Sequence, residues 1–126
     1  MLLNLTELSS EPLHSQITRQ LRARILTGEM PPGESLPSIR AMALELRVSV
    51  ITVQTSYDHL GREGLIFSKR TKGSFVSDLS LVQRKEMAKK RLMESFEPIL
   101  SAAISEGLTH GDIQTVVAEI FRQEES

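Results

Sequence analysis

The sequence predicts a mainly helical protein that contains one small β-hairpin. Three observations support this fold class: two short helical segments joined by a tight turn, a basic hairpin directly after them, and a helical tail. The chain has 126 residues, enough for one ordinary domain or for a small domain with an appendage. We expect a first domain over residues 1–78 and a helical region over residues 79–126.

The composition is that of a soluble globular protein, with 40% hydrophobic and 25% charged residues. The absence of cysteine excludes disulfides and thiolate metal sites, and it fits a reducing compartment. The N-terminal stretch MLLNLTELSS lacks the basic residues of a secretory signal, and no apolar run approaches the ~18 residues of a membrane span. We therefore expect a cytoplasmic protein without a membrane partner.

The net charge of −1 hides a basic segment. Between residues 62 and 91, nine Lys and Arg residues stand against three Asp and Glu residues. Such a segment suits a polyanionic partner, but it is also typical of a solvated helix face. Charge alone leaves both interpretations open.

The first helix is predicted within SSEPLHSQITRQLRARILTGEM. Ser10 can cap its N-terminus, Pro12 suits its first turn, and Gly28 can end it. Its apolar residues recur every four positions, at Leu13, Ile17, Leu21 and Ile25.

The second helix is predicted within PSIRAMALEL, with Ser38 as its N-terminal cap. It is short and needs tertiary contacts to form. The residues that share one face are Ile39, Met42, Ala43 and Leu46.

The stretch VSVITVQTSYDHLGREGLI, which begins at Val48, is rich in β-branched residues and favours a strand by propensity. The adjacent apolar residues Val50 and Ile51 break the alternation that a half-buried strand requires. A helix fits better, because Ser49 can cap it and Gly64 can end it. The side chains with helical spacing on its inner side are Val53, Ser56, Tyr57 and Leu60.

A β-hairpin follows, with strands predicted at residues 65–68 and 74–77. The KRTKG turn between them carries Lys69, Arg70 and Lys72 at its tip. Two helices joined by a tight turn form a helix-turn-helix, and the added hairpin makes it a winged helix.

The tail is predicted as a long helix from about Leu79 to Ser105, with a kink or break near Glu97 because Pro98 follows it. Gly107 can end this helix. Thr109 and Asp112 have the spacing of a capping box that starts the last helix.

A winged helix can bind DNA or another protein, and both functions remain open at this point. A DNA-binding winged helix places the start of its recognition helix in the major groove, where side chains contact base edges, and in this chain that helix is the one that Ser49 caps. The basic hairpin tip favours DNA, because three cations on one tip suit phosphates better than a protein surface.

LPSIR at residues 36–40 resembles the Leu-Pro-Ser-x-Arg signature of the GntR family of bacterial transcription regulators. LRVSVITVQTSYDHLGREGLI from Leu46 is similar to the recognition-helix segment of that family, and SKRTKGSFVS from Ser68 is similar to its wing. The resemblance covers roughly residues 10–78 and implies a dimeric, sequence-specific repressor on a short palindromic operator. The DNA-contacting residues that the resemblance or the basic tip implies are Arg40, Ser49, Val50, Ile51, Thr52, Gln54, Lys69, Arg70, Lys72 and Gly73.

The chain departs from the family pattern at four positions in or next to this contact set. Arg47 and Thr71 stand where relatives often have glycine, and Val50 and Ile51 stand where polar or basic residues are common. The aliphatic pair can contact thymine methyl groups, or it can be neutral while Thr52, Gln54 and Arg40 contact the site. Both interpretations stay open.

The tail resembles the short two-helix tail of the YtrA-like subfamily, which implies dimerisation and control of nearby transporter genes. A two-helix tail exposes more apolar surface than it can bury by itself, so we expect a second copy to cover it. The alternative is that this surface packs on its own winged helix. The predicted interface residues are Leu92, Phe96, Ile99, Leu100, Ile113, Val116, Val117, Ile120 and Phe121.

A small-molecule effector is left unidentified, and the compact tail predicts little volume for a pocket of the usual ~300–1,000 Å³. Catalysis is not expected. His14, His59 and His110 lie far apart in sequence, and no phosphate-binding loop, activated nucleophile or metal-ligand spacing is present. We expect no cofactor and no metal.

Overall fold

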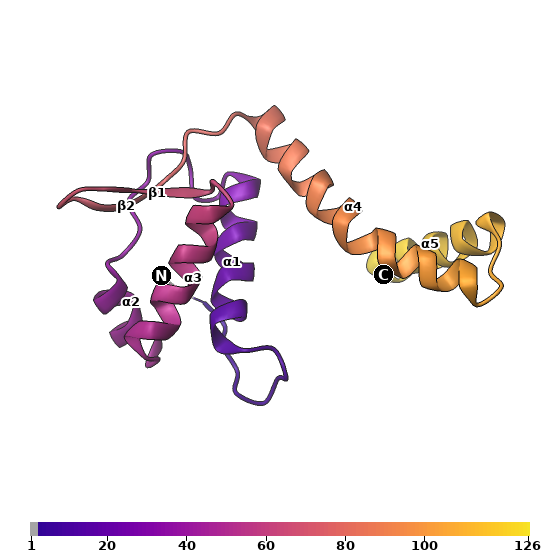
Figure 1. Ribbon diagram of the computed structural model, residues 1–126, viewed down its shortest axis with the longest axis horizontal. Helices are drawn as coiled ribbons and strands as arrows, with labels where there is room; N and C mark the ends of the chain where they lie inside the picture. Colours follow the sequence, from indigo (N-terminus) through magenta and orange to yellow (C-terminus); the bar gives the residue numbers. More distant parts are fainter. Residues whose placement is uncertain (1–2) are drawn as a thin grey trace. The chain divides into compact units, whose positions relative to one another are not determined.

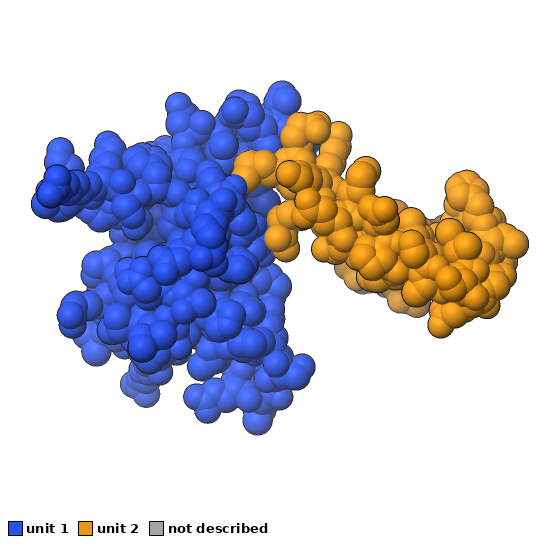
Figure 2. Space-filling view, in the orientation of Figure 1, with its two compact units in different colours: residues 1–85 blue, residues 86–126 orange. Residues whose placement is uncertain are grey.

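A computed structural model describes residues 3–126 and divides the chain into two compact units, Met1–Lys85 and Glu86–Ser126 (Figure 2). The first two residues of the predicted 1–78 domain lie outside the described part of the chain. The predicted class, mainly helical with one hairpin, is confirmed. The elements are α1 (Leu13–Thr27), α2 (Ile39–Leu46), α3 (Val50–Arg62), β1 (Ile66–Lys69), β2 (Gly73–Val76), α4 (Leu81–Ser105) and α5 (His110–Glu124).

In the first unit, α1 packs along α3, α2 packs on α3, and β1 of the hairpin follows directly from α3 (Figure 1). The predicted helical face of α3 is confirmed, because its four inner residues are all buried. Burial of such aliphatic side chains supplies most of the stabilisation of a small domain. The most deeply buried side chains of this core include Ile17, Leu21, Ile25, Met42, Val53 and Leu60.

Helix α1 begins later than the sequence predicts. Its N-cap is Pro12, and no side chain caps it, so the prediction for Ser10 is wrong. The reason lies in Gln16, which is buried and whose Nε2 donates to the carbonyls of Thr6 and Glu11 at 2.8 and 2.9 Å. These bonds fix the path of the chain just before the helix.

The segment of residues 3–11, here called the N-terminal arm, is held on α1 by two glutamines. The amide of Thr6 donates to Oε1 of Gln16 at 2.9 Å, so Gln16 both donates to and accepts from Thr6. Gln20 makes the same reciprocal pair with the backbone of Asn4, at 2.8 and 2.7 Å. Each side-chain amide therefore substitutes for the peptide group of a neighbouring strand.

Both α2 and α3 have the predicted N-terminal caps. Ser38 Oγ accepts from the amide of Ala41 at 3.1 Å, and Ser49 Oγ accepts from the amide of Thr52 at 3.0 Å. Arg47 closes α2 with a φ of 58°, in the left-handed region that favours glycine. Where relatives often have glycine, this chain therefore holds an arginine in a backbone conformation that favours glycine.

The same pair of hydrogen bonds ends three helices. At the end of α2, Arg47 N donates to the Leu44 carbonyl and Val48 N to the Ala43 carbonyl. The ends of α3 and α4 repeat this Schellman arrangement around Gly64 and Gly107, which also have positive φ. The predicted glycine stops of α3 and α4 are thus confirmed, and only α2 makes the motif without glycine.

Gly28, which ends α1, is restricted in two ways. Its φ is 84°, and a Cβ at this position would lie 2.5 Å from Nη1 of Arg84. Arg84, near the start of α4, donates to the carbonyl of Leu26 at 3.4 Å. A cation at the C-terminal end of a helix is favoured by the helix dipole.

The hairpin strands pair from Ile66 with Val76 to Lys69 with Gly73. Each strand lies one residue closer to the tip than predicted, because the amide of Leu65 bonds to Leu60 at the end of α3. Ser35 forms a further bridge with Phe75, so the outer edge of β2 is partly covered.

The turn of the hairpin contains the second departure from the family pattern. Lys72 N donates to the Lys69 carbonyl at 3.0 Å, and Thr71 between them has a φ of 66°. A positive φ at this turn position normally selects glycine or asparagine. A β-branched threonine there is strained.

The sequence predicts a kink or a break near Glu97. In the second unit, α4 continues through Pro98 to Ser105, so the break is excluded. A proline removes one hydrogen bond, which the remaining turns of a 25-residue helix can outweigh. The capping box is confirmed: Thr109 Oγ1 accepts from the amide of Asp112, and Asp112 accepts from the amide of Thr109. The backbone bond from Thr109 lowers the pKa of the Asp112 carboxyl.

Candidate nucleic-acid interface

The first turn of α3 presents an apolar surface to solvent. Val50 is 43% exposed and Ile51 is 76% exposed, whereas Val53, the next apolar residue along the helix, is fully buried. The turn begins at Ser49, whose side chain is used in the cap. The start of α3 is thus a free helix end with two aliphatic side chains at its tip.

The polar residues on this turn already have partners within α3. The hydroxyls of Ser49 and Thr52 lie 2.8 Å apart in a hydrogen bond. Gln54 donates from Nε2 to a carboxylate oxygen of Asp58 at 2.8 Å. Each group keeps further hydrogen-bonding capacity, because an amide nitrogen has two N–H donors and a hydroxyl oxygen has two lone pairs, but its orientation is already constrained by the internal bond.

Arg40 lies on the first turn of α2 and is exposed, and within residues 3–126 it has no hydrogen-bond or ion-pair partner. The start of α2 is fixed by the Ser38 cap and by Tyr57, whose hydroxyl donates to the carbonyl of Pro37 at 2.8 Å. Burial, aided by the charge of Glu45, raises the pKa of the Tyr57 phenol well above its usual value, so it stays a donor. This arrangement holds the backbone of Arg40 while leaving its guanidinium free.

The cations of the hairpin tip differ in their surroundings. Lys69 Nζ lies 5.1 Å from the ring centre of Phe75 and 5.8 Å from that of Phe67, a cation–π arrangement over two stacked rings. Arg70 and Lys72 are exposed and, in the described part of the chain, have no ion-pair partner. The two free cations stand at the end of the turn.

The predicted DNA-contacting residues all belong to the first unit and lie on α2, on the start of α3 and on the hairpin (Figure 1). Gly73, the last of them, pairs with Lys69 and has a φ of 97°. Sequence reasoning missed the supporting role of Tyr57, which was assigned only to the core. The available signal was a lone tyrosine on a buried helical face, because a buried phenol needs a hydrogen-bond partner.

The second unit gathers the predicted interface residues on one surface. All nine line a single apolar cavity of about 520 Å³ between α4 and α5, together with Ala103 and Leu108. No described residue of α4 or α5 is buried. The apolar surface of this unit is therefore open to solvent in the single chain.

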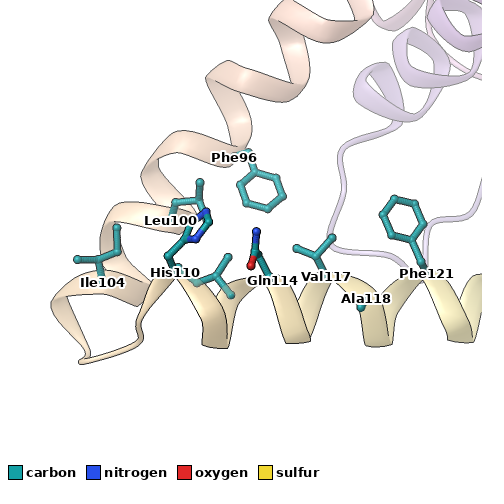
Figure 3. A pocket seen from close by; sticks show the side chains of 9 residues that line it. Phe96, Leu100, Ile104, His110, Gln114, Val117, Ala118 and Phe121 are labelled. Carbon is teal, nitrogen blue, oxygen red and sulfur yellow. The ribbon is translucent and has the colours of Figure 1, made fainter.

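A neighbouring hollow of about 570 Å³ has the same two walls (Figure 3). Phe96 and Leu100 reach it from α4, and Gln114, Val117 and Phe121 reach it from α5. The expectation that the tail has little volume for a pocket is therefore wrong. The volume arises because two helices alone leave an open groove that no third element fills.

Across residues 3–126 there is no group of three His, Cys, Asp or Glu side chains that could hold a metal ion. None of the described helices has the length and apolar character that a bilayer span needs.

Comparison with known proteins places this geometry in a family. Residues 13–76 match the family described as bacterial regulatory proteins, gntR family. The chain is 32% identical to the HTH-type transcriptional repressor YtrA of Bacillus subtilis over 116 residues, which cover 89% of each protein.

Solved structures share the fold. A GntR family transcriptional regulator from Listeria monocytogenes superposes with a TM-score of 0.72 over 88% of this chain and 96% of its own, at 23% identity. The DNA-binding domain of AraR in complex with its operator ORX1 has a TM-score of 0.53, covers 60% of this chain and 93% of its own, and is 25% identical. These relatives are regulators rather than enzymes. The chain therefore belongs to the GntR family and is a DNA-binding transcriptional regulator similar to YtrA.

Proposed function

We propose that the protein is a homodimeric repressor that binds a palindromic operator in the cytoplasm, near transporter genes. In this proposal residues 1–78 form the DNA-binding domain and residues 79–126 the dimerisation region. Two observations together carry the proposal: the first unit has an exposed helix start and free cations on α2 and the hairpin, and the tail has an open apolar surface. The first suits a duplex and the second suits another copy of the chain.

The DNA-contacting roles follow from chemistry. Arg40 has a free guanidinium, which can bind a guanine edge or a phosphate. Arg70 and Lys72 at the wing tip can bind phosphates or enter the minor groove. The remaining members of the proposed contact set are Ser49, Val50, Ile51, Thr52, Gln54, Lys69 and Gly73.

The proposed dimer rests on the apolar surface between α4 and α5. Five large side chains there, Leu92, Ile99, Val116, Ile120 and Phe121, are each more than half exposed. A second copy would present the same apolar surface, and a two-fold interface of this kind is self-complementary. A two-fold dimer places two recognition helices on two half-sites, so its operator is an inverted repeat.

Repression is proposed from the similarity to the YtrA repressor over almost the full length of both chains. The proximity to transporter genes is proposed from the resemblance to the same subfamily. An effector, if one binds, has no assigned chemistry in this proposal.

The test is selection of purified full-length protein on random duplex DNA at two salt concentrations. We expect an enriched inverted repeat whose affinity falls steeply with salt, because each phosphate contact releases counterions. Absence of enrichment by a folded dimer would contradict the proposal and favour a winged helix that binds a protein partner.

A further inference from the structure

We infer that Ile51 is a specificity-determining residue that packs on the 5-methyl group of a thymine in the major groove of the operator. This inference rests on the proposed function, because it names a base that the recognition helix contacts. It also decides between the two interpretations that the sequence leaves open for the aliphatic pair.

The first argument is exposure. Ile51 is 76% exposed on the first turn of α3, and Val50 beside it is 43% exposed. The core of the first unit already contains Val53, Leu60 and Met42, each fully buried, and it needs no further side chain from this turn. In the free protein the large aliphatic side chain of Ile51 therefore contributes little to core packing.

The second argument concerns the polar neighbours. A glutamine that distinguishes adenine uses its amide donor and its amide acceptor together. One of the two N–H donors of Gln54 is bonded to Asp58, and the hydroxyl of Thr52 is bonded to that of Ser49, so both side chains are oriented by partners within the protein. Val50 and Ile51 make no such internal bond, so their contact with the duplex requires no rearrangement of a hydrogen bond.

The third argument is the chemistry of the groove. Thymine is the one base that presents an apolar group, its 5-methyl, on the major-groove edge. A β-branched side chain on a helix is nearly fixed in one rotamer, so Ile51 loses little conformational freedom when it packs there. An exposed aliphatic group on the recognition helix is thus complementary to thymine and to no other unmodified base.

The experiment replaces each thymine of the selected operator, one at a time, with deoxyuridine. This change removes the 5-methyl group and leaves base pairing intact. At one thymine of a half-site we expect the unchanged protein to lose about fourfold in affinity, the effect of leaving one methyl-sized group unburied. The Ile51→Ala variant is expected to bind the thymine and deoxyuridine duplexes equally.

Two further variants serve as controls. Ile51→Val keeps a branched aliphatic group and should retain a preference for thymine. Leu44→Ala removes an aliphatic side chain that is 82% exposed but lies on α2, and it should keep the full preference.

The inference is overturned if no deoxyuridine replacement alters affinity, or if the loss persists in Ile51→Ala. Either result would leave an enriched, salt-sensitive operator intact, so the proposed function would stand. Failure to enrich any operator would overturn the inference and the proposed function together.

Discussion

Arg22 and Glu63 join α1 to the end of α3 through two parallel hydrogen bonds. Nε and Nη2 of Arg22 donate to the two carboxylate oxygens of Glu63 at 2.9 and 2.8 Å. The side chains are only 12% and 23% exposed, so water competes weakly for these bonds. The pair therefore fixes the recognition helix against α1, which contributes Ile17, Leu21 and Ile25 to the core.

We predict that Arg22→Ala destabilises the first unit by about 2 kcal/mol, because it removes two hydrogen bonds from a carboxylate that is only 23% exposed. Urea unfolding followed by circular dichroism measures this free energy. Arg19→Ala is the matched control, since Arg19 binds Glu11 in a much more exposed pair. Equal losses of unfolding free energy in the two variants would show that the Arg22–Glu63 pair stabilises the protein no more than the exposed pair does.

Arg47→Gly is expected to stabilise the protein by about 0.5–1 kcal/mol. The substitution relieves a left-handed backbone that costs a residue with a Cβ about 1–2 kcal/mol, minus the entropy that glycine loses on folding. Thermal unfolding measures the change. Ala41→Gly, in the ordinary helical backbone of α2, should have the opposite effect, a loss of about 1 kcal/mol. Destabilisation by both variants would contradict the role assigned to the backbone of Arg47.

Tyr57→Phe should cost about 1 kcal/mol at neutral pH, because the Pro37 carbonyl loses its donor. The pKa of the Tyr57 phenol is raised by burial and then by Glu45, from an ordinary value of 10.0. A raised pKa means that the unfolded chain releases this proton first. The stabilisation is therefore complete below about pH 10.0 and is lost as pH rises toward the folded-state pKa.

The alkaline measurement compares the two proteins across this window by urea unfolding. Tyr57→Phe should lose less stability above pH 10.0 than the unchanged protein. Tyr57 is the sole tyrosine, so phenolate absorbance reports its titration without interference. Parallel stability curves for both proteins would refute the linkage.

Arg40→Ala is predicted to weaken operator binding by about 1–3 kcal/mol and to leave dimerisation unchanged. Fluorescence anisotropy with the selected operator measures the affinity. The Arg19→Ala variant, which removes an arginine from α1, should bind normally. Unchanged affinity of Arg40→Ala would remove this residue from the contact set.

Replacing Ile120 and Phe121 together with Asp should convert the dimer to a monomer and abolish tight operator binding. Two carboxylates in an apolar interface cannot be desolvated without partners. Sedimentation velocity measures the oligomeric state. Gln123→Asp adds a charge to α5 outside the apolar surface and should leave the dimer intact. A double variant that remains dimeric would place the interface elsewhere.

Local signals in the sequence predicted much of the fold. The caps at Ser38, Ser49 and Thr109 and the stops at Gly64 and Gly107 depend on residues within a few positions, and each is confirmed. The helical nature of α3 followed from apolar spacing rather than from β-branched propensity, because packing outweighs a preference of a few tenths of a kcal/mol per residue.

The errors came from interactions between distant residues or between competing local terms. Ser10 does not cap α1, because Gln16 holds the preceding carbonyls, and no local pattern reveals such a side chain. The strands shifted because the end of α3 used the amide of Leu65. The Arg22–Glu63 pair joins residues 41 positions apart, beyond the reach of any spacing rule.

For the candidate site, the sequence identified the residues but not the hydrogen bonds and ring contacts that their side chains make within the protein. The bond between Gln54 and Asp58 and the position of Lys69 over two phenylalanine rings depend on side-chain rotamers. Such details decide which groups are free to meet DNA. They follow only once the backbone of α3 and of the hairpin is fixed.

The N-terminal arm has a consequence for how the family is compared. Its path is set partly by Gln16 and Gln20 on α1, besides the Glu11–Arg19 ion pair and the buried Leu3, and the family match begins at residue 13, after the arm. Two of the anchors of the arm, Gln16 and Gln20, therefore lie within the segment that matches the family. A relative with other residues at those two positions has no reason to carry its own leading segment along the same route, however closely its helices superpose.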